Sequence, residues 1–259
     1  MHADWLIPDW PAPAGVRAVF TTRAGGLSAA PYDSMNLGDH VGDAPARVAA
    51  NRALLKQAIG NRAVFLQQVH GSEVLALHAG TEDGQQADAC TTKEAGLACT
   101  IMVADCLPVL LATEDGSVVA AAHAGWRGLA GGKHGRGVLE SVHAAMGADA
   151  NTIAWLGPCI GPSAFEVGAE VKAAFEGVQS GAGRLFKPAG TGKYLADLPG
   201  LARLRLEALG INQVYGNDGS DAWCTVLNPS RFFSHRRDAG PNGNGLGTTG
   251  RMAACIWRD

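Results

Sequence analysis

Three unbroken apolar runs dominate the middle of this 259-residue chain. They cover Cys99–Ala104, Leu107–Ala112 and Val118–Ala122. Because polar residues do not alternate with apolar ones in these runs, the pattern predicts strands that are covered on both faces. Glu114-Asp115-Gly116, between the second and third runs, is typical of a hairpin turn in which glycine adopts a positive φ.

Shorter patterns predict further strands and helices on both sides of this centre. A helix is expected from Asp43, as its N-terminal cap, to about Ile59. Other amphipathic helices are predicted over Val167–Phe175, Leu198–Leu209 and the second half of residues 129–148. Strands are predicted over Gly15–Thr22, Val64–Val69, Glu73–Leu77, Thr152–Leu156, Ile211–Tyr215 and Met252–Trp257. Without a linker or an internal repeat, residues 1–259 are interpreted as one domain.

Composition excludes several classes of protein from this interpretation. The net charge of −3 provides no general attraction to nucleic acid or to a membrane surface. No apolar run reaches the roughly 20 residues that span a bilayer. The first 15 residues lack the basic start and the apolar core of a secretion signal. We therefore expect a cytoplasmic protein that binds neither nucleic acid nor membrane, with its six cysteines reduced.

Reactive side chains stand at the ends of three predicted strands, namely His70, Cys106 and His123. Two imidazoles and one thiolate would suit zinc, with a fourth position open to water or substrate. Alternatively, Cys106 could act as a nucleophile with His123 as its base. A third interpretation is a small buried cysteine and two hydrogen-bonded histidines. Spacing alone favours the third, because it does not show that the residues meet.

Two other segments have both a functional and a structural interpretation. The turn Arg23-Ala24-Gly25-Gly26 could bind an anion through its backbone amides, although such turns are more often plain surface turns. Asp88 could serve as a turn residue or line a site.

Several motifs together change these odds. The most specific are Ala104-Asp105-Cys106 and the HAGWRG sequence at residues 123–128. Supporting motifs are Thr21-Thr22-Arg23, Asn36-Leu37-Gly38, Gln67-Gln68-Val69-His70-Gly71, Leu156-Gly157-Pro158, Phe233-Ser234, Arg236-Arg237-Asp238 and Thr249-Gly250-Arg251. Through these motifs the chain closely resembles the YfiH-like family from about residue 15 to the C-terminus.

The resemblance implies an α/β (α+β) fold, a single layered domain with mixed β-sheets covered by helices and related to cysteine hydrolases. It also implies a zinc site made by His70, Cys106 and His123, with copper as the less favoured metal. Family members are described as purine nucleoside enzymes. They phosphorolyse adenosine, inosine, guanosine and methylthioadenosine, and they deaminate adenosine.

Residue chemistry assigns expected roles within that activity. Asp105 is expected to move protons during deamination. Phosphorolysis needs an anion pocket, for which Arg23 and Arg127 are the first candidates. Asn36 and His235 complete the residues expected to bind substrate or phosphate. The expected partners are a purine nucleoside and phosphate.

Two further activities are attached to the same family. One is peptidoglycan editing, in which an amidase removes L-serine from UDP-MurNAc-L-Ser, a UDP-muramyl precursor. That reaction would use zinc-activated water or a Cys106–His123 dyad, with Arg236 and Arg237 available for the nucleotide. The other is the multicopper polyphenol oxidase (laccase) activity. Eight histidines without an HxH pair argue against several copper centres.

One segment departs from the family pattern. Residues 239–248, rich in glycine, asparagine and proline, lengthen the connection between Asp238 and Thr249. We expect this insertion to be mobile.

Overall fold

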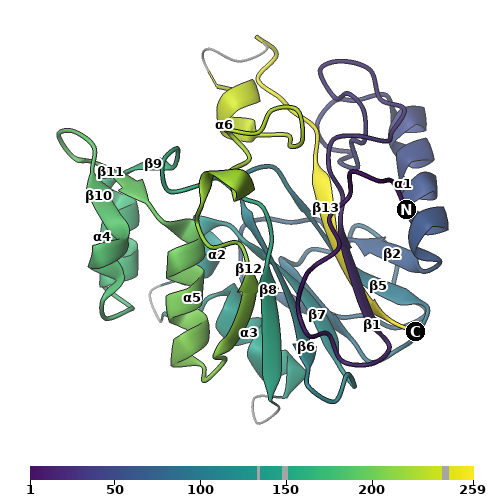
Figure 1. The fold of residues 1–259 in the computed structure, drawn as a ribbon, viewed down its shortest axis with the longest axis horizontal. Helices are drawn as coiled ribbons and strands as arrows, with labels where there is room; N and C mark the ends of the chain where they lie inside the picture. The colour runs from purple at the N-terminus through teal and green to yellow at the C-terminus, as the bar shows by residue number, and fades with distance from the viewer. Residues whose placement is uncertain (133–134, 148–150, 241–244) are drawn as a thin grey trace.

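Two β-sheets packed face to face form the centre of the computed structural model, which describes residues 1–132, 135–147, 151–240 and 245–259 (Figure 1). The first sheet has the order β1-β13-β5-β2. Strands β1, β13 and β5 are antiparallel, and β2 is parallel to β5. These strands are β1 (Val16–Phe20), β13 (Met252–Arg258), β5 (Leu97–Val103) and β2 (Arg62–Phe65).

The second sheet has six strands in the order β12-β8-β6-β7-β4-β3. Its two outer pairs are parallel and its inner pairs are antiparallel, so both main sheets are mixed. Its strands are β12 (Gln213–Gly216), β8 (Thr152–Leu156), β6 (Leu107–Thr113), β7 (Val119–Ala124), β4 (Ala89–Thr92) and β3 (Val74–Ala76). A separate antiparallel sheet contains β10 (Phe186–Pro188), β11 (Lys193–Ala196) and β9 (Glu166–Gly168).

Helices cover the outer face of each main sheet (Figure 1). Helix α1 (Pro45–Ile59) packs on the four-stranded sheet through Leu55 and Ile59. The apolar cluster on the outer face of the six-stranded sheet includes residues from four helices, α2 (Trp126–Ala130), α3 (Val138–Met146), α4 (Ala169–Glu176) and α5 (Leu198–Ala208). The shorter helices are η1 (Ala182–Leu185), η2 (Asp221–Trp223) and α6 (His235–Asp238). None of the helices in the described ranges has the length and apolar character to cross a membrane.

Burial on both faces explains the unbroken apolar runs. In β6, Val109 and Leu111 face the helices, whereas Leu110 lies between the two sheets. In β5, Ile101 lies between the sheets and Met102 faces α1. A polar residue on either face of these strands would be sealed from water, and an unpaired buried polar group is costly. The prediction that both faces are covered is confirmed.

The central hairpin is also confirmed, but the first two runs belong to different sheets. Strands β6 and β7 pair antiparallel, and Gly116 in their turn has φ +69°. Strand β5 instead pairs with β13 and β2, so the chain crosses from one sheet to the other at residues 104–106. This crossing places Asp105 and Cys106 where the two sheets meet.

Two sequence predictions are corrected by the structure. Asp43 is not the N-cap of α1, which begins at Pro45 with Ala44 as its cap. Both Asp43 oxygens are engaged, and one of them accepts from Ser28 and Asn36. The helix predicted from Val167 begins only at Ala169, because Val167 pairs with β11 as part of strand β9. Residues 241–244 of the 239–248 insertion lie outside the described residues.

Candidate active site

His70, Cys106 and His123 come from three separate elements and meet at one point. His70 lies between β2 and β3, Cys106 lies in the crossing from β5 to β6, and His123 lies near the end of β7. One ligand atom from each residue can be chosen so that all three atoms lie within 4.8 Å of one another. The Cys106 Sγ is 3.7 Å from the His70 Nε2. The structure therefore brings together the three residues that spacing alone could not connect.

The backbone around these residues is unusual. Among the described residues, His70 and Asp105 are the non-glycine residues with positive φ, at 62° and 91°. Such conformations are costly for residues with a side chain and gather at functional sites. Gly125 is required by close approach, since a Cβ there would lie 2.9 Å from the His70 Cδ2 and 3.0 Å from the Cys106 Sγ.

A buried carboxylate, Asp88, ties the two histidines together. Its Oδ1 lies 2.8 Å from the Nδ1 of His123 and accepts a hydrogen bond from the backbone amide of His70 at 2.9 Å. Its Oδ2 accepts from the amides of Val69 and Gly71 at 3.1 and 2.6 Å. Burial by itself raises the pKa of Asp88. Its hydrogen bonds with His123 and the backbone amides lower the pKa by more, so the net shift is downward.

An ionised Asp88 fixes the tautomer of His123. Because a carboxylate can only accept, the Nδ1 of His123 carries the proton and the neutral ring keeps its Nε2 lone pair for a ligand. A carboxylate behind a histidine is the usual support of a metal-binding imidazole. The donor set of two imidazoles and one thiolate fits a zinc ion and forms a candidate metal site.

The metal-free site favours a charged pair. Burial raises the pKa of Cys106, but the charge of His123 and hydrogen bonds with His123 and His70 lower it to about 6. Burial lowers the pKa of His123, but Cys106 and Asp88 raise it to about 9. The thiolate form of Cys106 is the form that binds metals and attacks carbonyl carbons.

The three donors open into a cavity of about 400 Å³. Its apolar wall includes the buried Phe165 and Ile160 and also Trp126. Cationic and imidazole side chains line it as well, namely His40, His235, Arg236 and Arg251. The cavity therefore combines metal-type donors, aromatic surface and positive charge in one space.

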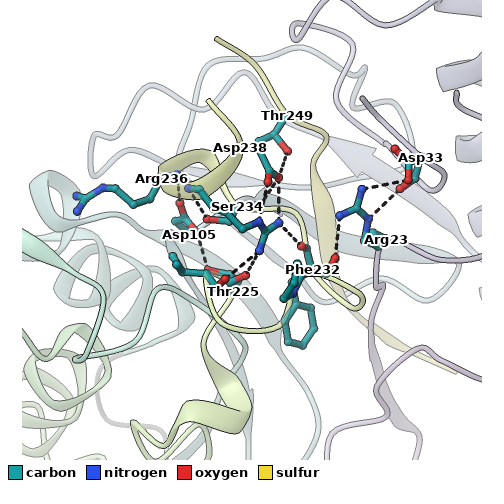
Figure 2. A network of polar contacts seen from close by, with 12 residues as sticks. Arg23, Asp33, Asp105, Thr225, Phe232, Ser234, Arg236, Asp238 and Thr249 are labelled. Atoms are coloured by element: carbon teal, nitrogen blue, oxygen red, sulfur yellow. Dashed lines mark hydrogen bonds and ion pairs between the residues drawn. The ribbon is translucent and has the colours of Figure 1, made fainter. Parts of the chain in front are cut away.

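Asp105 lines this cavity, but both of its oxygens are engaged by the protein (Figure 2). Oδ1 accepts from the Thr225 hydroxyl at 2.5 Å and Oδ2 accepts from the amide of Arg236 at 2.6 Å. The carboxylate thus ties the sheet crossing to the segments that carry Thr225 and Arg236.

Two of the expected anion-binding residues, His235 and Arg127, lie at or next to the cavity. His235 lines the cavity at the start of α6. Arg127 lies beside it, stacked on Trp126 with its Cζ 4.5 Å from the ring centroid, and lines an adjoining hollow together with His70.

Arg23 and Asn36 are not among the residues that line the cavity, so their expected roles in binding stay predictions. The Arg23 guanidinium donates to Asp33 and to the carbonyl of Pro229 (Figure 2). Asn36 is fully buried, and its side chain accepts from the amides of Gly38 and Arg251. Both side chains hold loops together.

Two residues were missed by sequence reasoning, namely His40 and Arg251, which both line the cavity. Asp88 was expected to be either a turn residue or part of a site, and the structure places it against both His70 and His123. Arg251 belongs to the Thr249-Gly250-Arg251 motif, but nothing in the spacing indicated that it faces the same cavity as Cys106.

Comparison with known proteins identifies relatives across the whole chain. A family model described as multi-copper polyphenol oxidoreductase laccase matches residues 17–259. A purine nucleoside phosphorylase of Pseudomonas aeruginosa is 46% identical and is covered over 98% of each chain. The purine nucleoside phosphorylase YfiH of Escherichia coli is 46% identical over 97% of this chain and 98% of its own length.

Solved structures share the fold. A Neisseria meningitidis protein is 45% identical, with a TM-score of 0.88 and coverage of 99% of both chains. YlmD from Geobacillus stearothermophilus is 30% identical, with a TM-score of 0.84 and coverage of 100% of this chain and 97% of its own. These matches confirm the mixed α/β fold and show that the chain belongs to the YfiH-like family, whose model is described as a multi-copper polyphenol oxidoreductase laccase.

Proposed function

We propose that this chain is a metal-dependent purine nucleoside phosphorylase, which splits a purine nucleoside with phosphate into the free base and ribose 1-phosphate. The observation that carries the proposal is the cavity, in which His70, Cys106 and His123 share one space with aromatic and cationic side chains. Relatives at 46% identity bear this name. The proposed substrates are adenosine, inosine, guanosine and methylthioadenosine.

The chain's own residues supply the binding functions of this reaction. Phe165 and Trp126 offer aromatic surface on which a purine can stack. Cationic side chains in the same cavity can hold phosphate by charge-assisted hydrogen bonds. His70, Cys106 and His123 would hold zinc, which as a Lewis acid polarises the substrate atom that it contacts.

Adenosine deamination is a proposed second activity of the same cavity. It requires a group that carries a proton to the leaving amine. Asp105 is the carboxylate nearest in sequence to Cys106, but its two oxygens already accept from Thr225 and Arg236. Phosphorolysis is therefore the better supported reaction, and for Asp105 we propose a positioning role.

A second candidate function, the removal of L-serine from UDP-MurNAc-L-Ser, is favoured by a specific arrangement. Asp88, His123 and Cys106 form the acid, imidazole and thiol series of a cysteine hydrolase. Such a triad would attack the amide carbonyl directly. A multicopper oxidase is not proposed, because among the described residues the metal-type donors form one three-residue group, whereas that chemistry needs several copper centres.

Phosphate dependence tests the proposed function. We expect the purified chain to release hypoxanthine from inosine only when phosphate is present, with ribose 1-phosphate formed in equal amount. Chromatography of the products with and without phosphate measures this. Release of hypoxanthine at the same rate without phosphate contradicts phosphorolysis, and phosphate-independent release of serine from UDP-MurNAc-L-Ser supports the amidase instead.

Metal content tests the roles of the three donors. We expect about one zinc ion per chain, and we expect Cys106→Ser to lower both zinc content and turnover by about 100-fold, because a hydroxyl replaces a ligating thiolate. Elemental analysis and inosine turnover measure the two effects. The control is Cys255→Ala, which removes a buried thiol on β13 outside the cavity. Full zinc and full turnover in Cys106→Ser would remove the metal assignment.

Asp88→Asn tests the support of the two histidines. The amide keeps the shape of the carboxylate but removes its charge and directs an NH₂ group at backbone amides or at the Nδ1 of His123. We expect zinc affinity to fall by about 10- to 100-fold. Competition with a chromophoric chelator measures the affinity. Asp9→Asn, at an exposed position, is the matched control. Unchanged affinity in Asp88→Asn would show that the carboxylate has no role in metal binding.

The pKa of Cys106 predicts a pH profile for the metal-free chain. Its thiolate forms as the pH rises through about 6, and the ion pair with His123 is lost again as the pH rises through about 9. The alkylation rate of Cys106 by iodoacetamide should therefore have its first midpoint near pH 6. In His123→Gln the midpoint should move toward 9, the ordinary value for cysteine. A midpoint that stays in place in this variant would contradict the charge pairing.

A further inference from the structure

Arg251 is a cationic cavity residue that keeps unused hydrogen-bond donors. It directly precedes β13 and lines the same cavity as His70, Cys106 and His123. Its Nη1 donates to the carbonyls of Thr249 and Gly250 at 2.9 and 3.2 Å. Within the described part of the chain, its Nε and Nη2 have no hydrogen-bond partner, and no carboxylate forms an ion pair with it.

The position of Arg251 is built rather than accidental. Its backbone amide donates to the Asn36 Oδ1 at 2.9 Å. Its aliphatic stem packs over Gly38, where an added Cβ would lie 2.7 Å from the Arg251 Cγ. The loop around Asn36 and Gly38 therefore holds the guanidinium in place, and an arginine that is held in advance loses less entropy when it binds.

The surroundings of Arg251 leave its charge available to a ligand. Burial lowers the pKa of Arg251, and the negative charges of Cys106 and Asp105 raise it in part. His40 lines the same cavity as Arg251. Burial lowers the pKa of His40, and the charge of Arg251 lowers it further. Arg236 is less available, since both of its terminal nitrogens donate to the carbonyls of Ala164 and Glu166.

We propose that Arg251, with His40 beside it, forms the subsite that binds inorganic phosphate, an assignment that rests on the proposed phosphorolysis. Two parallel N–H groups of a guanidinium match two oxygens of a phosphate. In the reaction a phosphate oxygen forms the bond to C1′ of the ribose while the bond from C1′ to the purine nitrogen breaks. The electron pair leaves with the base, which gains the proton that hydrogen phosphate loses.

Direct phosphate binding tests the subsite independently of turnover. Equilibrium dialysis of the full chain, as isolated, with labelled orthophosphate measures the dissociation constant for wild type, Arg251→Met and Arg47→Met. Arg47 is the matched control, an exposed arginine on α1. We expect Arg251→Met to weaken phosphate binding by about 10- to 100-fold, the usual effect of losing charged hydrogen bonds. Arg47→Met should match wild type.

A second variant guards against a folding defect. Gly38→Ala leaves every charge in place but pushes the Arg251 stem aside, so we expect it to raise the KM for phosphate with a smaller effect on the KM for inosine. If phosphate binding is equal in wild type and Arg251→Met, or if wild type binds no phosphate, the subsite assignment is wrong. The assignment is also wrong if Arg251→Met and Gly38→Ala both leave the KM for phosphate unchanged.

Two comparisons separate this proposal from the proposed function. If Arg251→Met loses phosphate binding while wild type cleaves no nucleoside, the subsite stands and phosphorolysis fails. If wild type phosphorolyses inosine and Arg251→Met keeps the phosphate KM, phosphorolysis stands and the subsite fails. Dialysis with uridine diphosphate distinguishes the source of the phosphate group, because Arg251-dependent binding that is tighter for uridine diphosphate than for orthophosphate would overturn the assignment to orthophosphate.

Discussion

The buried carboxylate of Asp88 is the constraint on which the site depends. A fully buried charge is tolerated only where hydrogen bonds replace its lost water. Asp88 has no exposed surface, and three backbone amides together with the His123 ring supply those bonds. The amides belong to the segment that carries His70. One charged group therefore fixes both the position of one histidine and the tautomer of the other.

The two-sheet architecture supplies the third donor. Strand β5 ends in the four-stranded sheet and β6 begins in the six-stranded sheet, so residues 104–106 must bridge the two layers. Asp105 adopts a positive φ at this bridge, and hydrogen bonds from Thr225 and Arg236 hold its side chain there (Figure 2). The same bend exposes one side of Cys106 to the cavity. The strained backbone thus coincides with the reactive sulfur, as is common at functional sites.

Arginine residues around the site show that residue type does not determine role. Arg237 donates to Asp238 and to the carbonyls of Thr225, Val226 and Phe232, and it functions as an internal brace. Arg23 has a similar function between loops. Arg251 differs because it lines the cavity and, among the residues that the structure describes, only its Nη1 has hydrogen-bond partners. What distinguishes a binding arginine here is the number of donors that the fold leaves unused.

The local pattern of apolar runs and turn residues predicted the central strands, and the three donors lie at or near the ends of predicted strands. Unbroken apolar runs indicated strands covered on both faces, and the turn at residues 114–116 indicated the hairpin between β6 and β7. The small sheet of β9, β10 and β11 was not predicted, because its strands are only three or four residues long and partly exposed. Family motifs, rather than spacing, selected His70, Cys106 and His123.

Only the tertiary structure decided which polar residues share a space. Separations of 36 residues between His70 and Cys106 and of 35 between Asp88 and His123 are closed by strand pairing and sheet packing, which no local pattern encodes. The same long-range packing removed Arg23 and Asn36 from the cavity and placed Arg251 in it. The sequence by itself determined which faces are apolar and which side chains can react, and the fold determined their partners, because proximity between distant segments depends on the whole core.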